Sequence, residues 1–125
     1  MARILIAEDE KPVRTLIART LAADGHLVVA TADGGEALDV LQRKNGGFDL
    51  LLADIKMPVM DGIALALAVA RDFPKLPILL MTGYADQRER TFGLEALIHD
   101  VIAKPFALAE IKFAMASAVA KGRRS

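Results

Sequence analysis

The sequence predicts a doubly wound α/β domain, in which helices cover both faces of a five-stranded parallel sheet. Five short apolar runs are continuous rather than alternating, which is typical of strands buried on both faces. The stretches between these runs carry apolar residues at helical spacing. This regular alternation of strand and helix favours parallel pairing with right-handed crossovers. With 125 residues, the chain has the length of one domain, and we expect a single domain over 1–125 without an output domain.

Each element is predicted by local signals in chain order. The expected strands are the apolar runs 4–7, 27–32, 50–53, 78–81 and 101–103. The expected helices, each following its strand, are 12–23, 35–44, 62–72, 87–97 and 108–120. Pro12 suits the first turn of the first helix, Gly25 stops it, and Phe73-Pro74 ends the third. The polar stretch 85–90 predicts a weakly held start for the fourth helix, before its apolar face begins at Phe92.

Composition excludes several classes of protein. The 16 basic and 16 acidic side chains balance, so net charge gives no general attraction to nucleic acid or to an anionic membrane. The absence of cysteine excludes disulfides, thiolate metal sites and cysteine nucleophiles. The first residues do not resemble a signal peptide, and no apolar run approaches the roughly 18 residues of a membrane span. We therefore expect a soluble cytoplasmic protein.

Chemically active side chains follow four of the five predicted strands. These residues, in chain order, are Glu8, Asp9, Asp54, Thr82 and Lys104. Gly83, which has no side chain, follows Thr82 and leaves the backbone open to an anion. Ligands of open parallel sheets bind at the carboxyl ends of the strands. We therefore expect these side chains to converge on one edge of the sheet, while the second strand, which ends in nothing distinctive, takes an outer position.

The residue types at this edge predict phosphoryl chemistry. Clustered carboxylates repel each other, so Glu8, Asp9 and Asp54 indicate that a cation is bound there. An all-oxygen set of this kind suits Mg²⁺. A carboxylate beside a divalent cation can attack a phosphoryl group and form an acyl phosphate. Lys104 and Thr82 are the cation and hydroxyl donor that would stabilise charge on the transferred oxygens.

The segments AEDE, ADIKMPVMDG, Thr82-Gly83 and KPF resemble the receiver domain of bacterial two-component response regulators. The resemblance covers essentially the whole chain and implies the flavodoxin-like, CheY-like (βα)5 fold with strand order 2-1-3-4-5. It implies Mg²⁺ as cofactor. It also implies a protein that takes up and releases its own phosphoryl group rather than an enzyme that turns over external substrates.

The resemblance also implies residue roles. Asp54 would be the phosphoryl acceptor, and Lys104 would pair with it before moving to the phosphoryl group. The implied roles are catalytic for Asp54, Lys104 and Thr82; phosphoryl-binding for Lys56, Thr82, Gly83 and Lys104; and metal-binding for Glu8, Asp9, Asp54 and the Lys56 carbonyl. Glu10 is interpreted as a solvated side chain instead.

The sequence departs from the receiver pattern at its switch residues. Receivers commonly carry Tyr or Phe three residues before the lysine, where this chain has Val101. The coupling of Thr82 to an aromatic switch at that position is therefore in question. Tyr84, the only tyrosine, is a candidate for the mobile ring; the alternative is that it rests on the loop surface.

The implied partners are a sensor histidine kinase or a histidine phosphotransfer protein, and a downstream protein, with no nucleic acid and no membrane. The resemblance places output on the fourth helix, fifth strand and fifth helix. The fifth helix is rich in alanine, which favours either close approach of a partner in a weak phosphorylation-dependent dimer or a generic helix of a monomer. Shorter segments also resemble the single-domain CpdR-type regulators, which prime substrate delivery to a Clp protease, so a protease adaptor role is a further hypothesis.

Alternative functions stay open. A phosphate shuttle to a histidine phosphotransfer protein would use the same chemistry. An aspartyl-nucleophile phosphatase usually needs a second acid two residues after the nucleophile, where this chain has Lys56. A flavodoxin-like electron carrier would need phosphate donors where AEDE places repelling charges. His26 and His99 are interpreted as surface residues rather than phosphohistidines.

Overall fold

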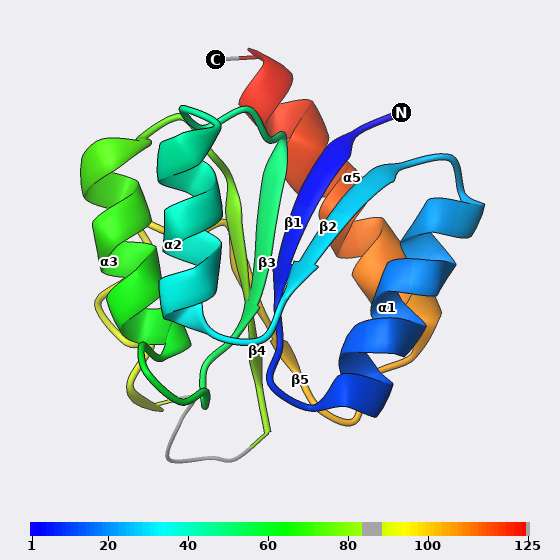
Figure 1. The fold of residues 1–125 in the computed structure, drawn as a ribbon, viewed down its shortest axis with the longest axis horizontal. Helices are drawn as coiled ribbons and strands as arrows, with labels where there is room; N and C mark the ends of the chain where they lie inside the picture. The colour runs from blue at the N-terminus through cyan, green and yellow to red at the C-terminus, as the bar shows by residue number, and fades with distance from the viewer. Residues whose placement is uncertain (84–88, 125) are drawn as a thin grey trace.

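The structure, a computed structural model, describes residues 1–83 and 89–124 and confirms the predicted fold class (Figure 1). Its five strands form one all-parallel sheet in the order β2-β1-β3-β4-β5. The strands are β1 (Arg3–Ala7), β2 (Leu27–Thr31), β3 (Leu50–Asp54), β4 (Ile78–Thr82) and β5 (Asp100–Ala103). The described helices are α1 (Lys11–Ala23), α2 (Gly34–Arg43), α3 (Gly62–Asp72) and α5 (Leu108–Arg124).

Two apolar cores lie on opposite faces of the sheet. In Figure 1, α1 and α5 lie on one side of the sheet, and α2 and α3 lie on the other. Successive β1 side chains alternate between the cores, with Ile4 and Ile6 on the α1 and α5 side and Leu5 on the α2 and α3 side. All three are fully buried. Burial on both faces is the reason why the strands read as continuous apolar runs.

The helix ends follow from the residues that border them. The Asp61 side chain accepts a hydrogen bond from the Ala64 N–H at 2.8 Å, which caps α3. Asp33 caps α2 in the same way, through the Glu36 N–H at 2.8 Å. Gly25, just beyond α1, has a φ of 89°, a left-handed conformation that favours glycine. The bounds predicted from the sequence for the first three helices therefore agree closely with the bounds of α1, α2 and α3.

Strand register determines which side chains meet at the carboxyl edge of the sheet. Ala7 pairs with Ala53, so the residues that follow them, Glu8 and Asp54, lie side by side. On the other side of β4, Thr82 pairs with Ala103, which places Lys104 at the same edge. The site is thus a consequence of parallel pairing.

The prediction of a helix over 87–97 is wrong for residues 90–97, which form turns instead. The Leu94 N–H donates to the Thr91 carbonyl at 3.0 Å, and the Leu97 N–H donates to the Leu94 carbonyl at 2.8 Å. Gly93 has a φ of 91°, which interrupts helical geometry. Phe92, expected to begin an apolar face, is 69% exposed. Residues 84–88 of the predicted loop and helix start lie outside the described residues.

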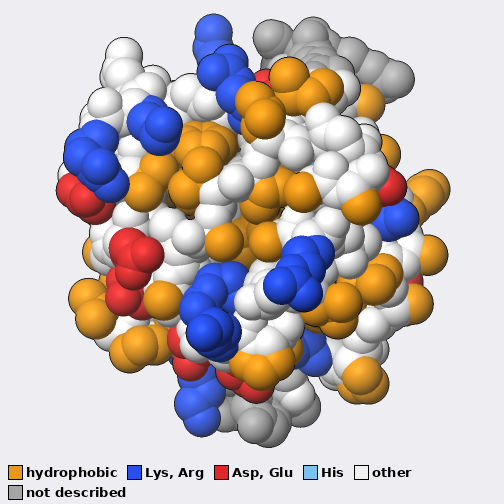
Figure 2. All heavy atoms as spheres, turned by 45° about the vertical axis from the view of Figure 1, so that its right-hand side comes forward, with side chains coloured by type: hydrophobic (Ala, Val, Ile, Leu, Met, Phe, Trp, Pro, Cys, Tyr) orange, Lys and Arg blue, Asp and Glu red, His pale blue; other side chains and the backbone are white. Residues whose placement is uncertain are grey.

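The outer face of α5 is not lined by small side chains alone, contrary to one interpretation of its alanines. Ala118 is fully buried and Ala114 packs against the core, whereas Phe113 is 78% exposed. The helix also runs on to Arg124, beyond the predicted end. Figure 2, which brings the α1 side forward, shows basic, acidic and hydrophobic side chains interspersed. Among the described residues, no helix is long and apolar enough to cross a membrane.

Candidate functional site

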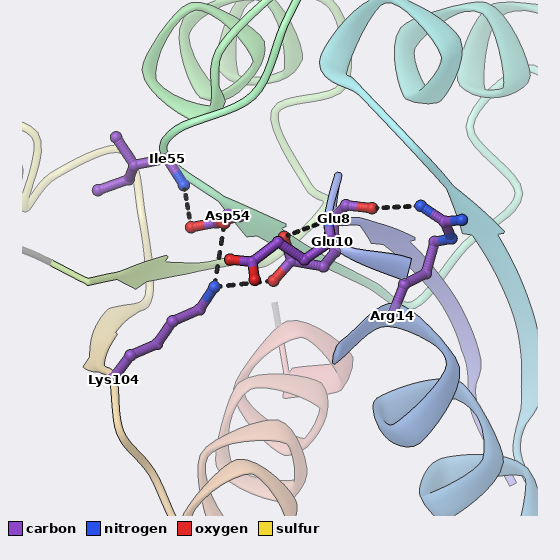
Figure 3. Close-up of polar contacts among 6 residues, drawn as sticks. All are labelled: Glu8, Glu10, Arg14, Asp54, Ile55 and Lys104. Atoms are coloured by element: carbon purple, nitrogen blue, oxygen red, sulfur yellow. Dashed lines mark hydrogen bonds and ion pairs between the residues drawn. The ribbon is translucent and has the colours of Figure 1, made fainter. Parts of the chain in front are cut away.

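Lys104 joins two buried carboxylates at the carboxyl edge of the sheet (Figure 3). Its Nζ lies 2.8 Å from Glu8 Oε1 and 3.0 Å from Asp54 Oδ2. Glu8 comes from the end of β1, Asp54 from the end of β3 and Lys104 from the end of β5. The structure thus brings together three of the residues that the sequence predicts for the site.

Burial dominates the electrostatics of this trio. Glu8 is fully buried and Asp54 is 5% exposed. Burial raises the pKa of Glu8 to about 7, and its hydrogen bond to Asp54 acts in the same direction, while Lys104 opposes both. Burial alone would lower the pKa of Lys104, but its bonds to Glu8 and Asp54 raise it instead. Lys104 therefore remains an ammonium cation at neutral pH.

Three carboxylates lie close enough together to hold a metal ion. Glu8, Glu10 and Asp54 each offer an oxygen, and these oxygens lie within 4.8 Å of one another. Glu10, interpreted from the sequence as a solvated side chain, is exposed and also belongs to this group. Asp9, the predicted ligand, is exposed and lies on the wall of the same cavity rather than within this group. An all-carboxylate set fits a hard cation such as Mg²⁺.

A cavity of about 680 Å³ opens beside these carboxylates. Its polar wall consists of Asp9, Glu10, Asp54, Lys56, Gly83 and Lys104, and its apolar wall consists of Val13, Leu16, Pro105 and Phe106. The Asp54 carboxylate therefore lies at a cavity with room for a small molecule or for a side chain of another protein. The apolar wall, which comes from α1 and the segment before α5, was not predicted from the sequence.

The turn that carries the acids is held from three directions. The Glu8 N–H donates to the Thr31 carbonyl at 3.0 Å, so the end of β2 supports it. The Arg14 guanidinium donates through Nη1 to the Glu8 carbonyl at 2.9 Å (Figure 3). The Arg14 N–H donates to the Glu10 carbonyl, also at 2.9 Å. Sequence reasoning missed Arg14, because its guanidinium bonds to a backbone carbonyl six residues earlier, outside the expected helix, and no sequence pattern indicates such a contact.

The loop after Asp54 is fixed to β3 and to the segment that precedes β5. The Ile55 N–H donates to Asp54 Oδ1 at 2.9 Å, and the Gly62 N–H donates to the Ile55 carbonyl at 2.8 Å. Asp61, beside Gly62, forms an ion pair with Arg90 at 2.6 Å. Hydrogen bonds to Ala64 and to Arg90 lower the pKa of Asp61, although burial acts against them. Arg90 is a second residue that sequence reasoning missed, because 29 positions separate it from Asp61.

The remaining predicted residues lie in different places. Lys56 and Gly83 lie on the wall of the cavity. Thr82 is buried at the end of β4, where its carbonyl accepts a hydrogen bond from the Lys104 N–H at 2.7 Å. Val101 is half-buried against the core on the α2 and α3 side. Tyr84, the candidate for a mobile ring, lies outside the described residues.

Known proteins resemble this chain in sequence. The profile of the response regulator receiver domain matches residues 4–116. The response regulator MprA from Mycobacterium sp. (strain KMS) is 37% identical over 109 residues, which is 87% of this chain and 46% of MprA. MprA from Mycobacterium avium (strain 104) is also 37% identical over 109 residues, which is 47% of its length. The chain thus spans about half the length of the curated relatives it matches.

Solved structures share the fold at full length. A CheY-like receiver domain protein from Methanospirillum hungatei superimposes with a TM-score of 0.89 and is 27% identical, covering 99% of this chain and 98% of that one. TrrA from Thermotoga maritima, solved in complex with Mg²⁺ and BeF, superimposes with a TM-score of 0.82. It is 28% identical and covers 94% of this chain and 99% of that one.

Proposed function

This chain belongs to the response regulator receiver domain family, and we propose that Asp54 is its phosphoryl acceptor. The family acts in two-component signalling, and its members bind Mg²⁺ at an acidic pocket. One observation carries the proposal of Asp54: this carboxylate lies at the cavity wall, is nearly buried, and contacts the Lys104 ammonium at 3.0 Å. Asp54 is therefore both accessible to a donor and held in place.

The reaction forms one bond and breaks one bond. A carboxylate oxygen of Asp54 attacks the phosphorus of the donor, and the bond from phosphorus to the donor's leaving atom breaks. That leaving atom is an imidazole nitrogen if the donor is a phosphohistidine, or an acetate oxygen if it is acetyl phosphate. The product is an acyl phosphate on Asp54.

Charge on the transferred oxygens would be neutralised by side chains of the site together with a bound cation. Mg²⁺, when bound among the carboxylates, would supply a divalent charge that offsets the charge of the phosphoryl group. Glu8 and Asp54 would hold it, with Glu10 or Asp9 from the same turn and the Lys56 carbonyl. Lys104 leaves the carboxylates for the phosphoryl group, and the Thr82 hydroxyl moves toward it. Gly83 adds no side chain that would obstruct the approach of an anion.

The output is a change in protein binding rather than turnover of an external substrate. Lys56 takes the place two residues after the acceptor where a phosphatase would need a general acid or base. A phosphoryl group adds about two negative charges at the sheet edge, enough to shift a loop between two states. We propose the surface formed by residues 89–97, β5 and α5 as the responding face. A cavity of about 440 Å³ on it is lined by residues that include Val101, Glu110 and Phe113.

The proposed partners follow from this chemistry. The phosphodonor is a sensor histidine kinase or a histidine phosphotransfer protein in the cytoplasm, and the receiver of the signal is a protein that contacts the responding face. Transfer back to a histidine phosphotransfer protein is the alternative output. Isotopically labelled phosphate that leaves the chain for a histidine domain, rather than for water, would favour that alternative.

Intact-mass measurement tests the acceptor assignment. We expect the chain to gain the mass of one phosphoryl group with acetyl phosphate and Mg²⁺, and to gain none when Mg²⁺ is chelated. Asp54→Asn should gain none under either condition, whereas Asp49→Asn, which changes an aspartate at the opposite end of β3, should behave as wild type. Equal phosphorylation of wild type and Asp54→Asn would refute the proposal.

A further inference from the structure

The acidic turn, residues Glu8–Glu10, connects β1, which ends at Ala7, to α1, which begins at Lys11. The Glu8 N–H still donates to the Thr31 carbonyl of β2, and the Glu10 carbonyl accepts the first hydrogen bond of α1. The Glu8 carbonyl, in contrast, needs a partner from outside the sheet and the helix backbone. How that partner holds the turn decides where its three carboxylates point.

Arg14 contacts the acidic turn on both sides of Asp9. Its guanidinium donates to the Glu8 carbonyl and its backbone N–H donates to the Glu10 carbonyl, each at 2.9 Å. Figure 3 shows the guanidinium reaching back from α1 to the Glu8 carbonyl, on the side away from Lys104. The bond to the Glu10 carbonyl is the first intrahelical bond of α1, which any residue but proline would donate, so the guanidinium contact is the one that depends on the Arg14 side chain.

Arg14 and Lys104 both contact Glu8, but Arg14 binds its backbone carbonyl whereas Lys104 binds its carboxylate. Lys104 contacts the carboxylates of Glu8 and Asp54, so it competes with a cation for their oxygens. Arg14 contacts the neutral backbone carbonyl of Glu8, so its guanidinium does not compete with a metal for the carboxylate oxygens. The positive charge of Arg14 would by itself repel a divalent cation from this turn. Its contribution to the site is therefore geometric.

We infer that Arg14 is a positioning residue for Mg²⁺: its hydrogen bond to the Glu8 carbonyl fixes the acidic turn so that the carboxylates of Glu8 and Glu10 lie beside that of Asp54. The inference rests on the proposed function, because it assigns Arg14 a role in the metal site of that same reaction. The charge of Arg14 and its hydrogen bond to the turn have opposite effects on Mg²⁺ affinity. Removing Arg14 removes a repelling charge, which favours the metal, and it frees the turn, which disfavours the metal.

Magnesium affinity of the full chain, followed by amide chemical shifts, tests the inference. We expect Arg14→Met to bind Mg²⁺ about tenfold more weakly than wild type, the low end of the effect of residues that orient metal ligands. Arg19→Met is the matched control, because Arg19 is an exposed residue of the same helix and its loss removes the same charge. Arg19→Met should bind Mg²⁺ as tightly as wild type or slightly more tightly.

The rate of phosphorylation by acetyl phosphate separates positioning from a general loss of structure. For Arg14→Met, the Mg²⁺ concentration at half-maximal rate should rise about tenfold, while the maximal rate at saturating Mg²⁺ stays within about twofold of wild type. If Arg14→Met does not fold, Arg14→Lys, which keeps the charge on a shorter donor, should show a weakening of several-fold.

The outcomes are distinct. If the folded Arg14 variant binds Mg²⁺ as tightly as Arg19→Met, the inference is overturned and the proposed function stands. If wild type itself binds no Mg²⁺, the proposed function fails, and the inference fails with it.

Discussion

The buried carboxylate of Glu8 should make the metal-free protein less stable as pH rises. Burial, with the help of Asp54, raises the pKa of Glu8 from 4.5 to about 7. A raised pKa means that the folded chain holds this proton more tightly than the unfolded chain does. The stabilisation is complete below pH 4.5 and is lost progressively as pH rises through about 7.

The size of the effect follows from the gap between the two pKa values. Each pKa unit corresponds to about 1.4 kcal/mol, so the gap corresponds to about 3 kcal/mol as an upper figure. Glu8→Gln replaces the acid with a neutral group of the same shape. Its amide oxygen can still accept from Lys104 and its amide N–H can donate to Asp54. We therefore expect Glu8→Gln to be more stable than wild type at pH 8, by about 1 to 3 kcal/mol.

Urea unfolding in EDTA at several pH values between 5 and 8 measures the difference. The advantage of Glu8→Gln should be smallest at pH 5, should grow as pH rises toward about 7, and should level off above that. Glu10→Gln, which removes an exposed charge from the same turn, is the control and should show no such growth. If Glu8→Gln is less stable than wild type at pH 8, the carboxylate is stabilised by Lys104 more than burial penalises it, and the reasoning is refuted.

Two further substitutions test the loop after the acceptor. In Gly62→Ala, the added Cβ would overlap the Asp54 carbonyl oxygen and lie 2.9 Å from Ile55 Cα, so we expect a loss of about 1 to 3 kcal/mol in urea unfolding and slower phosphorylation. Gly83→Ala is the control for stability alone, since among the described residues its added Cβ would meet Lys104 Cδ at 3.9 Å, an ordinary contact; an equal loss of stability in both variants would contradict the steric argument. Asp61→Ala removes the α3 cap and the ion pair with Arg90, and should cost about 1 kcal/mol. Arg90→Ala should cost less, because its side chain is 50% exposed, and a larger loss than for Asp61→Ala would show that the cap is not the main contribution.

Most of the fold could be predicted because its signals are local. Continuous apolar runs mark strands buried on both faces, and the bounds of β1 and α3 agree with the runs that predict them. The segment 90–97 could not be predicted in this way. Its apolar spacing indicates a helix, but Gly93 takes a left-handed φ, and Phe92 stays exposed. Glycine adopts positive and negative φ values about equally readily, so its presence in a helical pattern does not determine whether the helix continues.

The candidate site was predictable to the level of residue type and sheet edge. Strand ends place Glu8, Asp54 and Lys104 together whatever the side-chain rotamers are. The choice between Asp9 and Glu10 depends on the path of a three-residue turn, which sequence patterns do not determine. The link from Asp61 to Arg90 depends on tertiary packing, and no local signal encodes it.

The site of phosphorylation within the chain tests the central claim most directly. Borohydride reduces an aspartyl phosphate to homoserine, and trypsin should then release peptide 45–56, NGGFDLLLADIK, which contains both Asp49 and Asp54. These two aspartates lie at opposite ends of β3, so the peptide carries its own control. After treatment with acetyl phosphate and Mg²⁺, fragment masses should place homoserine at Asp54 and leave Asp49 unchanged. Homoserine at Asp49, or only in another peptide, would contradict an acceptor held between Lys104 and the acidic turn.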